Sequence, residues 1–387
     1  MKNQLHVAYL VSHYPHMAFG DDGGLGTSVY TLVEKIRRKN CYVSVFVYGQ
    51  KKEFEIKEEN LTIYSVPDSK ATFLKFYFHR KQIEKFIKNR IKTTAIDILE
   101  APDWTGITAF MSFDIPLIIR FHGSDAYFCN LEKRKQKFKN FFFEKIAVMR
   151  ANAFIAPTAF AGELSKEIFK IKKKEIRIIH YGLEIENFQN SNPENFDPEL
   201  ILYIGTIIRK KGVFELPSIF QLIIEKHPNS KLVLIGGDSF DIETGSSSTW
   251  NLVCNQFNKE TIGSVLYVGK IPYQEVKEYI KNAHVCIFPT FAETLGMVTI
   301  ESMALKKPVI NSNIGWSTEL IEDGISGYLV HPKNHALYAE RINQLFADKE
   351  KTITIGAAAR ARVEKNFDIE KIVFQNIDFY REVVTKK

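Results

Sequence analysis

One stretch of the sequence decides the fold: residues 285–304 read VCIFPTFAETLGMVTIESMA. Its first four residues are apolar and end at Pro289, which predicts a short buried strand. A loop follows, and a helix is predicted to begin near Leu295. Seven residues separate two carboxylates, Glu293 in the loop and Glu301 in the helix. A further apolar run at 308–310 completes a predicted strand–loop–helix–strand unit.

The start of this predicted helix is suited to an anionic ligand. Gly296 allows a ligand to approach the backbone closely, and the free N–H groups and the helix dipole favour a phosphate. Glu301 lies one turn further, on the face of Met297, where a carboxylate can accept hydrogen bonds from sugar hydroxyls. The alternative is structural: Glu293 caps the helix and Glu301 forms a surface ion pair. The surrounding strand and loop pattern favours the ligand-binding interpretation.

Length and composition indicate an ordinary globular protein of two or three domains, with 387 residues, 45% of them hydrophobic and 25% charged. The net charge of +7 suits an anionic ligand or an anionic membrane surface. The four cysteines are far apart and form no C-x-x-C pair, which argues against a metal cluster or a disulfide framework. Cys41 and Cys286 stand in apolar runs and are expected to be buried. Because the chain shows neither a signal peptide nor an apolar run long enough to span a bilayer, we expect a cytoplasmic protein.

Short apolar runs alternate with helical patterns along the chain, which predicts parallel sheets built from βαβ units. A polar segment rich in Asn, Glu and Pro, residues 183–198, is expected to link a first domain, 1–182, to a second domain, 199–368. The strands of the first domain are predicted at 7–11, 43–47, 96–99, 117–121, 154–156 and 176–179.

Polar residues follow several of these strands, at the ends where open α/β sheets bind ligands. His122 and Asp125 follow a strand of the first domain, although Asp125 could instead cap the next helix. Gly23 and Gly24 precede a helical pattern about a dozen residues after the first strand, too far along for a dinucleotide fingerprint. In the second domain, Arg209-Lys210-Lys211 stands between a strand end and a helix start, where cations can hold a diphosphate.

Two segments of the first domain, 70–92 and 131–150, combine Lys and Arg with Phe and Tyr. A basic amphipathic helix of this kind can lie on an anionic membrane surface. It can equally be a solvated helix face with its aromatic side chains in the core. Nucleic acid is not expected as a partner, because no recognised RNA- or DNA-binding motif accompanies the basic residues.

Taken with its neighbours, the stretch 285–304 resembles the E-x7-E signature of the retaining glycosyltransferases of family 4, the glycosyl transferases group 1. The resemblance continues through GWSTELI at 315–321 and DGISGYLV at 323–330. It covers nearly the whole chain and is strongest over 200–331. It implies the GT-B fold, an α/β architecture of two Rossmann-like domains facing across a cleft. A terminal helix, 369–387, is expected to pack back on the first domain.

The resemblance also implies roles for individual residues. Glu301 would hold the ribose hydroxyls of a nucleotide diphosphate sugar, and Glu293 would hold the donor sugar. The backbone at Leu295, Gly296 and Met297, with Lys211, would bind the diphosphate. The remaining members of the implied site are the glycine loop near the phosphates and acceptor (Gly23, Gly24), the H-G-x-D segment near the donor sugar or acceptor (His122, Asp125), and the backbone against the base (Ile271).

One position departs from the family pattern. An Arg usually follows the glycine at the end of the first strand of the second domain, and here Thr206 stands there. We expect Arg209 to supply this second cation. No Asp-x-Asp occurs in the chain, so we expect no metal and no other cofactor.

The expected function is therefore retaining transfer of a sugar, from a UDP-sugar rather than another nucleotide sugar, to an acceptor hydroxyl in cell-surface polysaccharide or glycolipid synthesis. The acceptor would be a sugar or a lipid-linked molecule, and the enzyme would be cytoplasmic or peripheral on the inner face of the membrane. Two alternatives are a sugar-nucleotide epimerase of the same fold and a non-enzymatic membrane-surface protein, which leaves both glutamates without a role. A glycoside hydrolase also uses two carboxylates, but it does not need the basic loop at 209–211.

Overall fold

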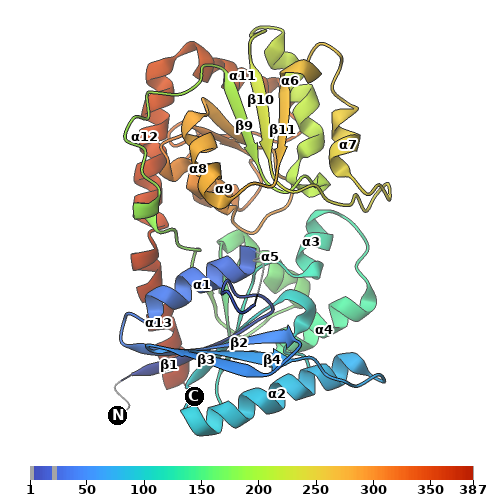
Figure 1. Cartoon of the computed structure of the whole chain (residues 1–387), viewed down its shortest axis with the longest axis vertical. Helices are drawn as coiled ribbons and strands as arrows, with labels where there is room; N and C mark the ends of the chain where they lie inside the picture. Colours follow the sequence, from blue (N-terminus) through green and yellow to red (C-terminus); the bar gives the residue numbers. More distant parts are fainter. Residues whose placement is uncertain (1–3, 20–23, 387) are drawn as a thin grey trace. The chain divides into compact units, whose positions relative to one another are not determined.

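Two parallel sheets organise the chain in the computed structural model, which describes residues 4–19 and 24–386 (Figure 1). The residues divide into two units, Met1–Gly182 with Ile369–Lys387, and Leu183–Asp368. The first unit therefore combines both ends of the chain, drawn in blue-green and red in Figure 1.

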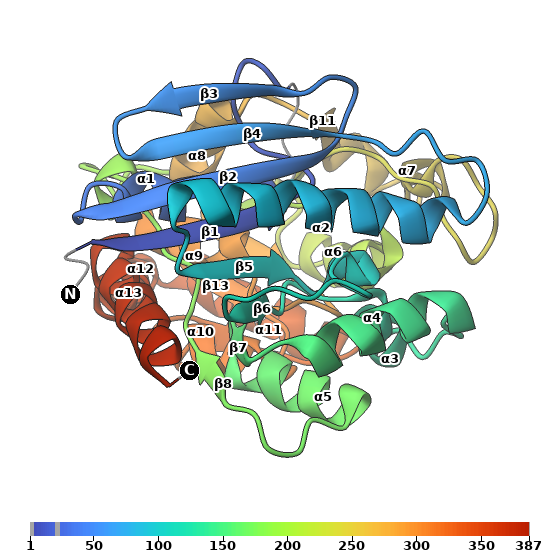
Figure 2. The ribbon, with the colours of Figure 1, turned by 90° about the horizontal axis from the view of Figure 1, so that it is seen from below.

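The sheet of the first unit has the strand order β3-β4-β2-β1-β5-β6-β7-β8, which Figure 2 shows edge to edge. All neighbouring strands are parallel except β3 and β4. The strands are β1 (Leu5–Val11), β2 (Cys41–Gln50), β3 (Phe54–Glu58), β4 (Leu61–Pro67), β5 (Ile98–Pro102), β6 (Leu117–Arg120), β7 (Ala153–Ala156) and β8 (Ile176–Ile178). The helices are α1 (Gly24–Ile36), α2 (Lys75–Thr94), α3 (Asp125–Leu131), α4 (Phe138–Arg150), α5 (Ala159–Phe169) and α13 (Ile369–Thr385).

Helices cover both faces of this sheet, because alternate residues of each strand point to opposite sides. Val7, Tyr9 and Val11 of β1 pack in one core with α1 and α13, whereas Ala8 and Leu10 pack in another core with α2. The C-terminal helix α13 thus completes the core of the first unit, where the terminal helix was expected.

The predicted strands of the first unit are confirmed, with ends that differ by up to a few residues. The hairpin of β3 and β4 was not predicted. β3 is a short edge strand with every residue exposed or half-buried, and its alternation of apolar Phe54 and Ile56 with charged residues is too short to stand out. Cys41 and Cys286 are buried and unpaired with any other cysteine, as expected.

The second unit contains a six-stranded parallel sheet with the order β11-β10-β9-β12-β13-β14. Its central strands are fully buried apolar runs, as parallel sheets covered on both faces require. The strands are β9 (Leu200–Ile204), β10 (Lys231–Ile235), β11 (Val265–Gly269), β12 (Val285–Phe288), β13 (Val309–Asn311) and β14 (Tyr328–Leu329). The helices are α6 (Leu216–Ile224), α7 (Thr249–Cys254), α8 (Tyr273–Asn282), α9 (Met297–Ala304), α10 (Ser317–Leu320), α11 (His335–Ala347) and α12 (Lys349–Asn366).

The segment 183–198, expected as a linker, belongs to the second unit instead. Phe188 is buried, the Asn190 side chain donates to the carbonyl of Leu305 at 2.9 Å, and the N–H of Asp197 donates to the carbonyl of Asn282 at 2.9 Å. These contacts hold the segment against the second unit. In the sequence, its many polar residues made it resemble a free linker. Among the described residues, no helix combines the length and the apolar character needed to cross a bilayer.

Candidate active site

In the second unit, two loops that the sequence singled out are fastened together. The carbonyl of Lys210 accepts the N–H groups of Phe291 and Ala292, at 2.8 and 3.3 Å. Gly212 makes this approach possible: its φ is +73°, and a Cβ atom there would lie 1.7 Å from the carbonyl oxygen of Pro289. The basic loop after β9 and the loop after β12 therefore form one surface at the carboxyl ends of neighbouring strands.

Lys211 and Glu293 meet on this surface as an ion pair. Burial opposes ionisation of Glu293, but Lys211 and the N–H of Thr294 outweigh it and hold the pKa of this carboxyl below its ordinary value. The Thr294 N–H donates to Glu293 Oε1 at 2.9 Å. Glu293 is thus a fixed carboxylate beside a fixed cation, as an orienting group in a site for a charged sugar donor would be.

The start of α9 directly follows. The helix begins at Met297, two residues after the predicted start, because Gly296 adopts a φ of +97° that only glycine takes readily. Among the described residues, no side chain caps this helix, and its first turn holds no acidic residue. Leu295 is fully buried and anchors the turn. A half-buried helix start without a side-chain cap, beside the ion pair of Lys211 and Glu293, is a site where backbone N–H groups can bind phosphate.

Glu301 lies one turn into α9 and is 8% exposed. Burial raises its pKa to about 7, although Tyr273 and Lys277 act in the opposite direction. The Tyr273 hydroxyl donates to Glu301 Oε1 at 2.6 Å. Ile271, expected beside the base, lies two residues before Tyr273, in the turn between β11 and α8. The structural alternative of an exposed ion pair is therefore wrong for Glu301, because this carboxylate is buried and its closest partner is a neutral hydroxyl.

Arg209 is held by a second pair of carboxylates rather than left open to solvent. Its Nε and Nη2 donate to Asp241 at 3.0 and 2.8 Å, and Glu243 lies 3.0 Å away. The Arg209 hydrogen bond is the main reason that the pKa of Asp241 falls to about 2. The guanidinium also lies 4.2 Å from the ring centre of Phe214. A diphosphate that recruits Arg209 must therefore compete with Asp241.

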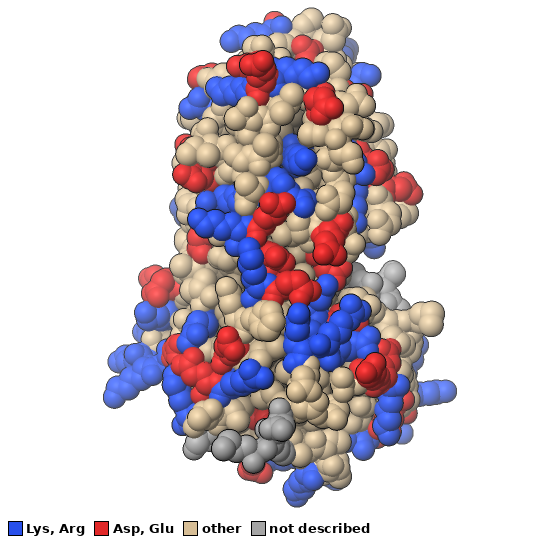
Figure 3. Space-filling model, turned by 90° about the vertical axis from the view of Figure 1, so that its left-hand side faces the viewer, with Lys and Arg blue, Asp and Glu red and all other residues tan. Residues whose placement is uncertain are grey.

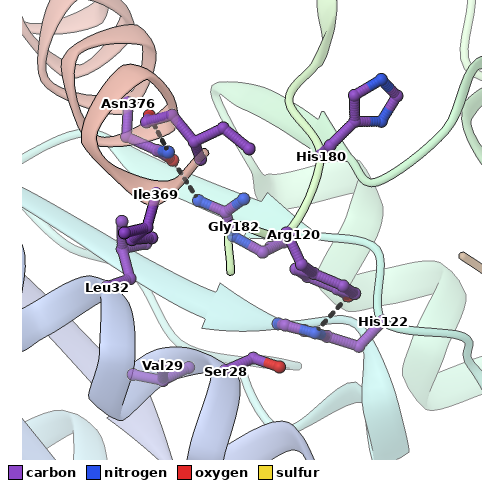
Figure 4. Close-up of a pocket in the computed structure, with 11 residues that line it drawn as sticks. Ser28, Val29, Leu32, Arg120, His122, His180, Gly182, Ile369 and Asn376 are labelled. Atoms are coloured by element: carbon purple, nitrogen blue, oxygen red, sulfur yellow. Dashed lines mark hydrogen bonds between the residues drawn. The ribbon is translucent and has the colours of Figure 1, made fainter. Parts of the chain in front are cut away.

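In the first unit, His122 follows β6 and lines a small pocket with α1 and α13 (Figure 4). The Tyr181 hydroxyl lies 2.7 Å from His122 Nδ1, and the two rings stack at 5.5 Å. Burial, with a smaller contribution from the charge of Arg120, lowers the pKa of His122 to about 3. The imidazole is therefore neutral at physiological pH.

A buried polar network forms one wall of this pocket. Arg120 donates to Glu100 at 2.7 and 3.0 Å and to Asn376 of α13 at 2.5 Å. The hydroxyl of Tyr380 donates to Glu100 at 2.6 Å. Figure 4 shows the contact between Arg120 and Asn376 on one side of the pocket and His122 on another. The pocket wall is thereby joined to the C-terminal helix.

Two buried carboxylates hold the backbone that carries His122. Asp103 accepts the N–H of His122 at 2.9 Å, and Glu144 accepts the N–H groups of Asp125 and Ala126 at 2.8 and 3.0 Å. Burial raises the pKa of Asp103 to about 7, although the neighbouring N–H groups favour its ionised form. These two acids fix the loop 122–126 from outside it.

Asp125 does not cap α3, because the N-cap is Ser124, whose hydroxyl accepts the N–H of Tyr127 at 3.1 Å. The Asp125 carboxylate instead accepts from Arg134 and Asn140, each at 3.1 Å. Gly24 begins α1 at the helix start that was expected, whereas Gly23 lies outside the described residues.

The sequence analysis missed four residues of these two groups: Glu144, Tyr181, Asp241 and Tyr273. Tyr181 follows a strand end, so its position could have singled it out. Glu144 and Tyr273 stand in helices and have no such signal. Glu144 accepts from backbone N–H groups 18 and 19 residues away, and Tyr273 donates to a carboxylate 28 residues away.

Comparisons with known proteins identify the family of the chain. The Glycosyl transferases group 1 family matches residues 184–362, and the Glycosyltransferase Family 4 family matches residues 22–187. The chain is 25% identical over 376 residues to an uncharacterized glycosyltransferase of Methanocaldococcus jannaschii, covering 96% of each chain. It is 28% identical over 253 residues to CapM, the capsular polysaccharide biosynthesis glycosyltransferase of Staphylococcus aureus, covering 62% of this chain and 63% of CapM.

Solved structures share the fold at low sequence identity. Sucrose-phosphate synthase from Thermosynechococcus elongatus has a TM-score of 0.79 at 20% identity, covering 99% of this chain and all of the other. Anabaena HepE in complex with UDP has a TM-score of 0.71 at 17% identity, covering 98% of this chain and all of the other. The predicted GT-B fold is confirmed, and the matched families together span residues 22–362. The chain belongs to the group 1 glycosyltransferases.

Proposed function

We propose that this glycosyltransferase moves a sugar, with retention of its anomeric configuration, from a UDP-sugar to an acceptor hydroxyl in the synthesis of a cell-surface polysaccharide or glycolipid. The observation that carries the proposal is the start of α9. An uncapped helix start lies between a Glu293–Lys211 ion pair and the buried Glu301. A nucleotide sugar has a matching order of groups: sugar, diphosphate, ribose.

Each group of the donor has a partner in this assignment. The N–H groups at the start of α9 and the ammonium of Lys211 bind the diphosphate and stabilise the negative charge that develops as the bond to the sugar breaks. Glu301 accepts hydrogen bonds from the ribose hydroxyls, and Glu293 orients the sugar. The backbone near Ile271 lies against the base. Gly23, Gly24, His122 and Asp125 of the first unit contribute contacts to the donor or the acceptor.

One structural neighbour, HepE, supports uridine as the base. The solved HepE complexes contain UDP, and one contains UDP-glucose. A starch synthase of the same fold is bound to ADP and acarbose, so the fold itself accommodates more than one base.

A thermal-shift panel of UDP-, GDP- and ADP-sugars tests the base, because a bound ligand raises the apparent stability by mass action. We expect the largest shift with a UDP-sugar and a much smaller shift in Glu301→Ala. A larger shift with a GDP-sugar contradicts the uridine assignment. Isomerisation of the donor in the absence of acceptor supports the epimerase instead.

We also propose that turnover needs no divalent metal. The chain contains no Asp-x-Asp to clamp a phosphate-bound metal, and Lys211 with the start of α9 supplies positive potential at the same place. Activity should stay within about twofold after treatment with a chelator, a change of less than ~0.5 kcal/mol in the barrier. Loss of turnover that magnesium or manganese restores contradicts this.

For the acceptor, we propose that the enzyme lies peripherally at the inner face of the membrane and receives a lipid-linked acceptor there. The basic and aromatic helices of the first unit, α2 and α4, support this placement. The chemistry of their exposed surface indicates which kind of lipid the enzyme would bind.

A further inference from the structure

An exposed aromatic surface covers the starts of α2 and α4 in the first unit. Phe73 is 76% exposed and Phe138 is 81% exposed, although buried positions are normal for phenylalanine. Contiguous exposed apolar patches are uncommon on soluble proteins and mark interaction sites. The aromatic surface consists of Phe73, Leu74, Phe76, Tyr77, Phe78, Phe138 and Phe142, all of them exposed.

Its two helices form one continuous surface. Phe138 stacks on Phe142 at 6.2 Å, and Phe142 lies 6.4 Å from Phe110. Phe110 in turn lies 5.7 Å from Tyr77, which contacts Phe78 at 5.6 Å. Phe76 of α2 also lies 6.2 Å from Phe143 of α4, and in Figure 2 the right-hand end of α2, which crosses the sheet, lies near α4. The exposed rings are therefore neighbours in space and not single residues scattered over the surface.

The aromatic surface is held rigidly from below. Arg80, which is 4% exposed, donates to the carbonyls of Phe76, Thr105 and Gly106 at 3.0, 2.8 and 3.1 Å. Leu74, the N-cap of α2, has a φ of +45°, a conformation that leucine rarely adopts, and its side chain is exposed. The start of α2 thus keeps apolar side chains outward although neither the helix cap nor the core requires them there.

Cations surround the aromatic surface. Lys139 lies over the ring of Phe76, 3.2 Å from its centre. The surrounding lysines are exposed, and none has a carboxylate partner within the described part of the chain: Lys75, Lys133, Lys135, Lys137 and Lys139. By contrast, the face drawn in Figure 3 mixes Lys and Arg with Asp and Glu throughout.

We propose that the aromatic surface docks on an anionic lipid bilayer, with its phenyl rings entering the headgroup–acyl boundary and its lysines binding lipid phosphates. Phenylalanine has no hydrogen-bonding group, so these rings match hydrocarbon better than the hydroxyl-rich surface of a polysaccharide. Lysine stems can lie along apolar surface while their ammonium groups reach the anionic headgroups. A second copy of this chain is a poorer match, because like-charged lysines would face one another.

The position of the aromatic surface suits the proposed acceptor and deepens the proposed function. α2 follows β4, so it begins at the carboxyl-end side of the sheet, the side where His122 follows β6. A bilayer on the aromatic surface therefore presents a lipid-linked acceptor to the same side of the first unit as His122. Docking on the bilayer does not depend on the sugar-transfer reaction. A negative result for membrane docking would therefore leave the proposed sugar transfer standing, and the reverse is also true.

The test is sedimentation with two kinds of vesicle, one of phosphatidylcholine alone and one that also contains about 30% of the anionic lipid phosphatidylglycerol. Each is used at low and at high salt. The full-length chain should sediment with the anionic vesicles at low salt and lose most of this binding at high salt. Phe73→Ser with Phe138→Ser should reduce the apparent partition coefficient about tenfold or more. Lys135→Gln with Lys137→Gln should reduce it less and weaken its salt dependence.

Phe374→Ser is the matched control. Phe374 is also an exposed phenylalanine of the first unit with a lysine, Lys39, over its ring, but it lies on α13 outside the aromatic surface. We expect it to bind vesicles like the wild type, and all variants to keep turnover on a soluble acceptor. Equal loss in the Phe374 variant overturns the proposal, as does wild-type protein that stays in the supernatant. Binding to a soluble acidic polysaccharide without vesicle binding, or self-association that Phe138→Ser abolishes, likewise overturns it.

Discussion

Two helix starts, that of α3 in the first unit and that of α9 in the second, follow strand ends of similar sheets but are chemically opposite. At α3 the N–H groups are already bonded: Glu144 accepts those of Asp125 and Ala126, and Ser124 accepts that of Tyr127. At α9 no side chain within the described residues caps the helix.

The difference shows that a helix start at a strand end is not by itself a phosphate site. An anion at α3 would face the carboxylates of Asp125 and Glu144, whose charge repels it. The first unit therefore positions a neutral imidazole with internal carboxylates. The second leaves the start of α9 without a side-chain cap, beside the ion pair of Lys211 and Glu293. The three predictions below test this division.

Glu293→Gln should have the largest effect. The change removes the carboxylate that Lys211 and the Thr294 N–H hold in place, and we expect kcat to fall about 1,000-fold, ~4 kcal/mol in the barrier. The thermal shift with UDP should remain, because Glu293 is assigned to the sugar. Glu275→Gln, an exposed carboxylate of α8, is the control. If affinity for UDP falls as much as kcat, Glu293 does not have the assigned role.

Glu301→Gln should change how stability depends on pH. Burial raises the Glu301 pKa from 4.5 to about 7, so the folded chain keeps a proton that the unfolded chain has released. In the wild type this carboxyl therefore lowers the free energy of unfolding as pH rises from 4.5 to about 7, and the loss is complete above that. The variant should lack this loss. The difference in free energy of unfolding, variant minus wild type, should therefore be up to ~3 kcal/mol larger at pH 8 than at pH 4.

Denaturant titrations at several pH values measure this difference. Glu186→Gln replaces an exposed carboxylate of the same unit and should leave the pH dependence unchanged. Parallel curves for the wild type and Glu301→Gln would mean that Glu301 ionises as freely in the folded state as in the unfolded state.

Asp103→Asn tests the first unit and should have the smallest of the three effects. An amide cannot accept as strongly from the His122 backbone, so the loop should shift and kcat should fall about 10- to 100-fold. The wild-type kcat should itself decline as pH falls through about 7, where Asp103 gains a proton, whereas the variant should stay low at all pH values. Asp103→Glu should restore part of the activity.

The affinity for UDP separates this positioning role from general damage, since the base, the ribose and most of the diphosphate contacts are assigned to the second unit. It should be unchanged in Asp103→Asn. Asp114→Asn, an exposed acid of the same unit, should behave like the wild type in every assay. Loss of UDP binding together with kcat would mean that Asp103 acts through global stability.

The positions of most strands of the first unit and of the second-unit loops could be predicted from the sequence, because apolar runs and glycines act locally. Lys211 and Glu293 are 82 residues apart and still meet, since both follow ends of neighbouring strands. The rest depends on contacts without a local signal. Nothing in the helical sequence around Glu144 shows that its carboxylate bonds the backbone of another helix start, and the polar composition of 183–198 conceals its packing.

The position of α13 in the core of the first unit has a consequence for the order of events during synthesis. The strand β1 is made before the second unit, and the helix that completes its core is made after the whole of the second unit. Until Asn376 and Tyr380 arrive, Arg120 and Glu100 lack two of their partners. The core of the first unit therefore cannot be completed until the second unit, which is continuous in sequence, has been synthesised.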